Sequence, residues 1–165
     1  MKRAVRERSA PGRQSLTLVI DASAGIKLFI SEPLSDRAEA LFDRLKSDPS
    51  TLFYVPDLFF VECANILWKY VRRFGYPAEN ASQDVADLRR LRLRSVSTAD
   101  LITDAFSIGL RHSLTLYDSS YVALAQRLAA PLITADERLA QTLPGPEFNV
   151  RWLGDYSLPW PPEAT

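Results

Sequence analysis

A short run of apolar and β-branched residues that stops at an acidic residue most limits the folds open to this chain. Leu16–Ile20 contains no charged residue and no polar–apolar alternation, and Asp21 follows it directly. This pattern is typical of a strand that is buried on both faces. Such strands belong to parallel sheets covered by helices, so the run predicts an α/β fold.

The rest of the chain alternates between strand-like segments and segments with the apolar spacing of helices. Strands are predicted at residues 16–20, 52–55, 95–97, 132–134 and 148–153, the last at an edge. Helices are predicted at residues 21–30, 34–48, 58–74, 78–91, 99–111 and 118–130, with a further turn or two from Asp136. This alternation predicts a three-layer α/β/α fold around a mainly parallel sheet of four to five strands.

Composition favours one domain with a polar extension at each end. The chain has 165 residues, and 47% of them are hydrophobic, which is enough for one sizeable core. We expect a flexible basic arm at residues 1–15, the domain at residues 16–153 and a Pro-rich tail at residues 154–165. No run approaches the ~20 apolar residues of a membrane span, and no signal peptide is recognisable, so a cytoplasmic location is expected.

Three aspartates share one local position, next to the start of a predicted helix. They are Asp21, Asp118 and Asp136, and each follows a short apolar stretch or strand. Helix capping is the simplest explanation, because Asp is a favoured N-cap that stabilises a helix by roughly 1 kcal/mol. Asp21 and Asp136, however, follow strands that should be central and parallel. The carboxyl ends of such strands open into the crevice where ligands bind.

Glu62 is the more informative acid because it interrupts an apolar helix, LFFVECANILW at residues 58–68. Burial of a carboxylate without a partner costs several kcal/mol. At helical spacing Glu62, Asn65 and Lys69 share one narrow polar stripe. Either Glu62 pairs with Lys69 or a neighbouring Arg on the surface, or it faces the same crevice as the aspartates.

The four candidate carboxylates belong to Asp21, Glu62, Asp118 and Asp136. Gathered in one cleft they would repel one another, and a divalent cation would relieve that repulsion. Cys63 and His112, the chain's one Cys and one His, have no ligand-type neighbours in the sequence, so oxygen atoms would hold the metal. Oxygen ligands select Mg²⁺ or Mn²⁺, which can activate water and orient a phosphodiester. The predicted chemistry is phosphodiester hydrolysis.

Four segments resemble the motifs of the PIN-domain ribonucleases, and particularly of the VapC-type toxins of toxin–antitoxin pairs. They read VIDASAGIKLFISEP at 19–33, VPDLFFVECANILWK at 55–69, LTLYDSSYVALAQRL at 114–128 and LITADERL at 132–139. The segments come in the family's order and at about its spacing. Together they cover nearly the whole predicted domain.

The resemblance implies that the four carboxylates hold Mg²⁺ or Mn²⁺ and that the chain hydrolyses structured RNA such as tRNA or rRNA. It also implies a supporting role for the hydroxyls of Ser23 and Thr134 and for the amide of Asn65, which would orient Glu62. A homodimer and a small antitoxin partner that reaches into the site are implied as well.

Two other functions stay open on the sequence. Asp-based phosphotransfer also uses an aspartate after the first strand, but Ser23 replaces the second Asp of a DxD start. A non-catalytic α/β interaction module would need the acids only as helix caps. Metal binding separates the ribonuclease from the module, because a ligand of the native state must raise its stability.

Overall fold

The computed structural model describes residues 15–143 and 146–156, and five strands within them form one parallel sheet. The strands are β1 (Thr17–Ile20), β2 (Leu52–Pro56), β3 (Leu93–Val96), β4 (Leu132–Thr134) and β5 (Val150–Trp152). Their order across the sheet is β3-β2-β1-β4-β5, so β1 is central and β3 and β5 lie at the edges. The predictions of a mainly parallel sheet and of a final edge strand are confirmed.

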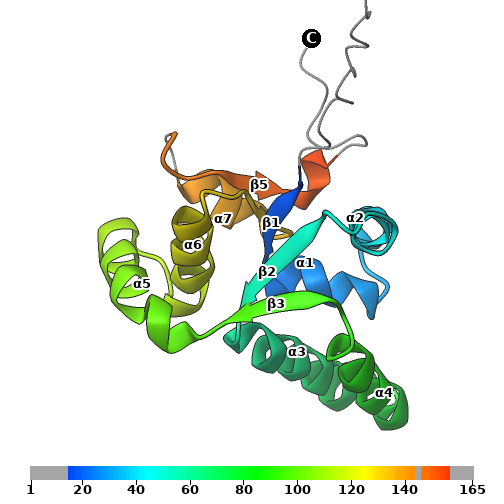
Figure 1. Cartoon of the computed structure of the whole chain (residues 1–165). Helices are drawn as coiled ribbons and strands as arrows, with labels where there is room; N and C mark the ends of the chain where they lie inside the picture. Colours follow the sequence, from blue (N-terminus) through cyan, green and yellow to red (C-terminus); the bar gives the residue numbers. More distant parts are fainter. Residues whose placement is uncertain (1–14, 144–145, 157–165) are drawn as a thin grey trace, which may run out of the picture.

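Helices connect the strands and cover both faces of the sheet. They are α1 (Ala22–Gly25), α2 (Ser35–Ser47), α3 (Leu58–Phe74), α4 (Ala78–Leu88), α5 (Thr98–His112), α6 (Leu116–Leu128) and α7 (Glu137–Thr142), with 3₁₀ turns η1 (Ile26–Leu28) and η2 (Leu153–Asp155). Figure 1 shows α5 and α6 on one side of the sheet and α1 to α4 on the other. The predicted three-layer α/β/α architecture is therefore confirmed.

The core forms where α6 crosses the middle of the sheet. Leu18, Val19 and Ile20 of β1 have no exposed surface, because β1 is paired on both edges and covered on both faces. Tyr121 and Leu124 of α6 are equally buried. The first strand therefore lacks alternation because neither of its faces meets water.

β3, α6 and β5 each begin two residues from the predicted start, and β5 begins at Val150 instead of 148. β3 spans Leu93–Val96 instead of 95–97, because these four residues pair with Phe53–Pro56 of β2. α6 begins at Leu116, because the hydroxyl of Thr115 accepts the backbone N–H of Asp118 at 3.1 Å and caps the helix. The expectation that Asp118 opens this helix is wrong, since Asp118 lies within its first turn.

The predicted arm and tail fall largely outside the described residues, which begin at 15 and end at 156. Residues 154 to 156 still pack on the domain, because the guanidinium of Arg37 in α2 donates to the carbonyl oxygens of Gly154 and Tyr156. In the part of the chain that the structure describes, no helix is long and apolar enough to cross a membrane.

Candidate active site

The sheet order places a topological switch point, where α/β sheets bind their ligands, at the carboxyl ends of β1 and β4. The chain passes from β1 to β2 and β3 on one side, and then returns to β4 and β5 on the other. Connections that leave a central strand in opposite directions open a crevice between the two strand ends. Asp21 follows β1 directly, and Asp136 comes two residues after Thr134, the last residue of β4.

Asp21 is a buried carboxylate that does not serve as a helix cap. It occupies the N-cap position of α1, yet its side chain accepts no capping hydrogen bond, and the residue is only 6% exposed. The hydroxyls of Ser23 and Thr134 both donate to its Oδ2 at 2.6 Å. Burial raises the pKa of Asp21 despite these hydrogen bonds, and the charge of Asp118 raises it further.

Ser23 and Thr134 join the ends of β1 and β4 as well as contacting Asp21. The Oγ of Ser23 accepts the backbone N–H of Ala135 at 2.9 Å, and the Oγ1 of Thr134 accepts that of Asp136 at 3.0 Å. The two hydroxyl oxygens lie 3.2 Å apart. Each hydroxyl therefore orients the Asp21 carboxylate and also fixes the loop that carries Asp136.

Glu62 lies on the second turn of α3 and is held from across the site. The hydroxyl of Tyr121, a wholly buried residue of α6, donates to its Oε2 at 2.5 Å. Burial raises the pKa of Glu62 from 4.5 to about 7, with further contributions from the charges of Asp21 and Asp118. No ion pair joins Glu62 to Lys69 among the described residues, so the surface-pair alternative finds no support.

Asp118 belongs to the first turn of α6 and lies close enough to Asp21 and Glu62 for its charge to raise their pKa values. The hydroxyl of Thr115 donates to its Oδ2 at 2.9 Å and in return accepts its backbone N–H. Burial raises the pKa of Asp118, and the charge of Asp136 adds to the effect. Because Thr115 supplies the cap, the Asp118 carboxylate is not needed to start the helix.

Asp136 is the one candidate for which the helix-cap interpretation holds. Its Oδ1 accepts the backbone N–H groups of Arg138 and Leu139 at 2.9 and 3.3 Å, at the start of α7. The residue is exposed, unlike the other three acids. Its charge still acts on Asp118, so Asp136 lies at the outer edge of the same acidic group.

The four carboxylates interact electrostatically, but they are not closed around a single point. No three acidic, His or Cys side chains of residues 15–143 and 146–156 form a cluster that could hold one ion directly. Hydroxyls or backbone N–H groups donate to at least one oxygen of each carboxylate: Oδ2 of Asp21, Oε2 of Glu62, Oδ2 of Asp118 and Oδ1 of Asp136.

The donor set fits a hard divalent cation held partly through water. All four groups offer oxygen, and none forms an ion pair with Lys or Arg in the part of the chain that is described. Repulsion among the acids is therefore left uncompensated. Mg²⁺ keeps several of its waters and needs direct bonds to only one or two carboxylates, so an open arrangement of this kind suits it.

Sequence reasoning missed Tyr121 and assigned Asn65 a contact that the structure lacks. Tyr121 is buried in an apolar helix, and only the folded structure reveals that its hydroxyl reaches Glu62 of α3. Its position three residues after Asp118, one turn along the same helix face, is the signal that could have identified it. Asn65 is exposed, and no hydrogen bond of the described residues connects it to Glu62.

A family comparison agrees with this geometry. The family model of the PIN domain matches residues 18–142, which include all four carboxylates. The chain therefore belongs to the PIN domain family.

Relatives within the family are the VapC ribonucleases. Ribonuclease VapC3 of Pyrobaculum aerophilum is 35% identical over 131 residues, which cover 78% of this chain and 96% of that protein. Ribonuclease VapC3 of Mycobacterium tuberculosis is 30% identical over 137 residues, covering 83% and 95%. These similarities group the chain with the VapC-type members of the PIN family.

Solved structures share the fold at lower sequence identity. A crystal structure from Pyrobaculum aerophilum has a TM-score of 0.64 at 21% identity and covers 87% of this chain and 88% of its own. Mycobacterium tuberculosis VapC20, described as a sarcin–ricin loop cleaving toxin, has a TM-score of 0.55 at 17% identity and covers 72% and 87%. A toxin–antitoxin complex from Klebsiella pneumoniae has a TM-score of 0.57 at 17% identity, covering 81% and 95%.

Proposed function

We propose that the chain is a metal-dependent endoribonuclease and the toxin of a VapC-type toxin–antitoxin pair. The observation that carries this proposal is Asp21. It is a buried carboxylate at the carboxyl end of β1, and it does not cap its helix. Its charge also interacts with the charges of Glu62 and Asp118. Family membership and the ribonuclease relatives support the activity.

Mg²⁺ or Mn²⁺ is the cofactor in this proposal, with Asp21, Glu62 and Asp118 as principal ligands and Asp136 at the edge. When bound, such an ion lowers the pKa of a coordinated water and stabilises charge on the phosphate. The hydroxyls of Ser23 and Thr134 both donate to the Oδ2 of Asp21, so they would hold this carboxylate in place as a ligand.

Glu62 is the group best suited to take a proton from the attacking water. Its charge interacts with those of Asp21 and Asp118, so Glu62 lies beside the proposed ion and the water that the ion would hold. The hydroxyl of Tyr121 fixes one oxygen and orients the other toward the crevice. A carboxylate held in this position would support hydrolysis by water.

The expected partners are RNA of the tRNA or rRNA class, a small antitoxin protein and a second copy of the chain. Large apolar side chains that remain exposed support protein contacts. They are Val61, Trp68 and Phe74 on α3, Ile102, Phe106 and Leu110 on α5, and Leu116 and Tyr117 on α6. Single exposed apolar residues are ordinary, but three on one helix at four-residue spacing, as on α5, form a continuous stripe.

An RNA cleavage assay with and without EDTA tests the proposal, with the cut ends mapped. Cleavage should require Mg²⁺ or Mn²⁺ and should be abolished in folded Asp21→Asn and Asp118→Asn proteins. The matched control is Asp36→Asn, which removes an acid from the first turn of α2 outside the crevice. If the two site variants cut RNA as fast as the parent, the proposed site is wrong.

A further inference from the structure

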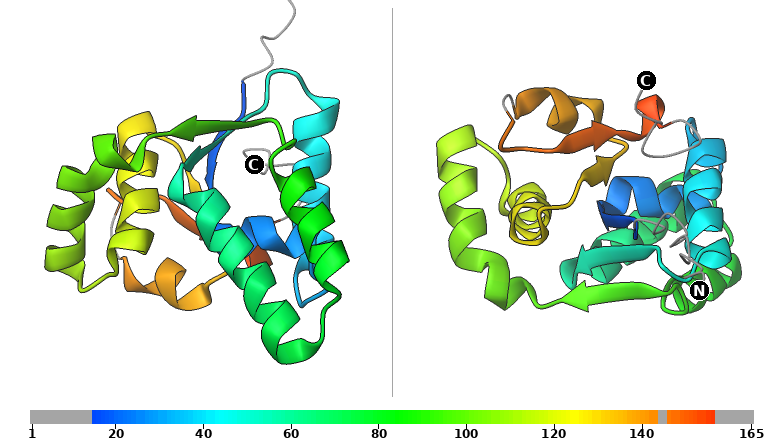
Figure 2. Two further views of the ribbon diagram at one scale, coloured as in Figure 1. Left: turned by 90° about the horizontal axis from the view of Figure 1, so that it is seen from below. Right: turned by 45° about the horizontal axis from the view of Figure 1, so that its top comes forward.

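The face of α3 that carries Glu62 continues away from the crevice as a line of polar and basic residues. Lys69 and Arg73 follow Glu62 by seven and eleven residues, close to two and three helical turns, so the three side chains lie on one stripe. Asn65 lies beside that stripe, one turn from Glu62. Asn65, Lys69 and Arg73 are all exposed. The left view of Figure 2 shows α3 running outward from the sheet with α4 beside it.

No side-chain hydrogen bond or ion pair of the described residues engages these two cations, and their place on the face of α3 that carries Glu62 distinguishes them from other exposed basic residues. No ion pair joins Lys69 or Arg73 to a carboxylate within residues 15–143 and 146–156. In contrast, Arg90 pairs with a carboxylate, Arg92 donates to carbonyl oxygens at the end of α2, and Arg94 lies over a tyrosine ring. The α3 stripe therefore presents two positive charges that no carboxylate of the described residues neutralises.

The positive charges of the stripe can offset the repulsion between the acidic site and RNA. The carboxylates of the crevice repel a polyanion, so an RNA strand needs cations beside them to stay in place. At 1.5 Å per helical residue, Lys69 and Arg73 lie roughly 10 Å and 16 Å along the axis from Glu62. A few nucleotides of extended strand cover such a length.

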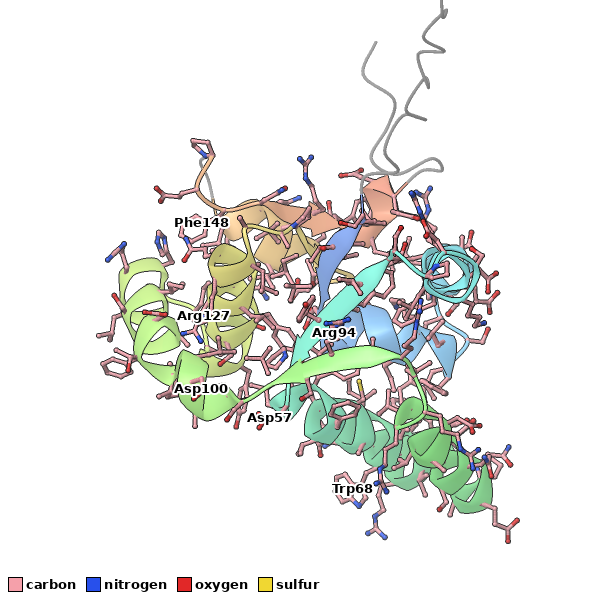
Figure 3. The ribbon with its side chains drawn as sticks, in the orientation of Figure 1. Asp57, Trp68, Arg94, Asp100, Arg127 and Phe148 are labelled. Atoms are coloured by element: carbon pink, nitrogen blue, oxygen red, sulfur yellow. The ribbon has the colours of Figure 1, made fainter. Side chains whose placement is uncertain are left out.

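A protein partner would use a different face of α3. The exposed apolar residues Val61 and Trp68 lie about 100° or more around the helix from Glu62, outside the Lys69–Arg73 stripe. Trp68 is labelled in Figure 3, where it points outward from α3. A protein partner that buries these apolar side chains does not need the two cations, so RNA suits the stripe better.

We propose that Asn65, Lys69 and Arg73 of α3 bind the RNA backbone on one side of the phosphate that is cleaved. The proposal rests on the proposed ribonuclease function. Lys69 and Arg73 contact phosphates as charges, and the Asn65 amide donates to a phosphate or ribose oxygen nearer the site. Phosphate contacts position the strand without reading its sequence.

The test compares two pairs of substitutions with the same charge change. One is Lys69→Gln/Arg73→Gln. The control is Lys46→Gln/Arg90→Gln. These exposed cations lie near the amino ends of β2 and β3, whereas the site lies at the carboxyl ends of the strands. Binding of a fluorescent single-stranded oligoribonucleotide of about 12 nucleotides is measured by anisotropy over a range of salt concentrations. All proteins carry Asp21→Asn to suppress cleavage, and Mg²⁺ is present.

Loss of two phosphate contacts should lower the salt slope of log affinity by about 1.4, and affinity near 0.1 M salt by on the order of 25-fold. The control pair should keep the slope of the background protein. With Asp21 restored, Mn²⁺ affinity of the Lys69→Gln/Arg73→Gln protein should match the parent. If both pairs bind RNA alike while the parent still cuts RNA, the stripe is not an RNA site. If the parent neither binds nor cuts RNA, the proposed function itself fails.

Discussion

Replacement of Glu62 by Gln should stabilise the protein when metal is absent. In the metal-free state Glu62 shares the crevice with Asp21 and Asp118, and burial together with their charges raises its pKa to about 7. Gln removes the charge and keeps an oxygen that can accept the hydrogen bond from Tyr121. The variant therefore loses a repulsion without losing the contact that orders the side chain.

The size of the effect follows from the pKa. A pKa raised from 4.5 to about 7 corresponds to about 3.4 kcal/mol of folding free energy once the group is fully ionised. Glu62 is only partly buried, so solvent screening reduces this to about 1.5–2 kcal/mol. At ~2–4 °C per kcal/mol for a domain of this size, the Tm of the variant should rise by about 5 °C.

The pH dependence has a definite sign. Because the folded pKa of this acid is raised, the folded state holds the proton more tightly than the unfolded state does. The cost of ionised Glu62 is absent below its ordinary pKa of 4.5, develops as the pH rises to about 7, and is complete above that. The Tm advantage of Glu62→Gln should therefore be full near pH 8 and vanish near pH 4.5.

Thermal unfolding in EDTA across this pH range is the assay, with Glu39→Gln as the control. Glu39 is an exposed acid of α2, so its variant should track the parent at every pH. Added Mn²⁺ should reverse the order of the parent and Glu62→Gln, because a ligand of the native state raises stability only where it binds. A metal-free variant no more stable than the parent near pH 8, or a difference that does not change with pH, would refute the reasoning.

Two further predictions concern residues that support the site. Tyr121→Phe removes only the hydroxyl that orients Glu62, and should weaken Mn²⁺ binding by about 10-fold or more in calorimetry while the fold is retained; unchanged affinity would mean that the hydrogen bond does not position the ligand. Gly25→Ala places a Cβ 2.6 Å from the buried ring of Phe59, and should cost about 1–3 kcal/mol in urea unfolding through overpacking between α1 and α3; an unchanged midpoint would show that the ring moves aside freely.

The sheet and its central strand could be predicted because burial leaves a direct mark on sequence. The run of apolar and β-branched residues at 16–20 and the helical spacing of the following segments were enough to predict these elements. The start of α6 could not be read in the same way. Leu116 and Tyr117 were expected to precede the helix, and only the reciprocal hydrogen bonds between Thr115 and Asp118 identify them as part of its first turn.

The acids of the site and the hydroxyls that contact Asp21 could be predicted from the sequence, but the contact of Tyr121 with Glu62 could not. Asp21, Ser23 and Thr134 lie in short motifs at strand ends, where the parallel topology brings them together. Tyr121 is different, because a tyrosine in an apolar helix looks like any other core residue until the helix facing it is known. Its contact with Glu62 joins residues 59 positions apart, which no local pattern reveals.

Titration of the protein with Mn²⁺ in a calorimeter, parent against Asp21→Asn, tests the central claim most directly. The account predicts saturable binding and a higher Tm for the parent. Asp21→Asn should remain folded, bind Mn²⁺ far more weakly and gain no thermal stability from it. Equal Mn²⁺ binding by the two proteins, or none by the parent, would contradict a metal site built on the buried carboxylate of Asp21.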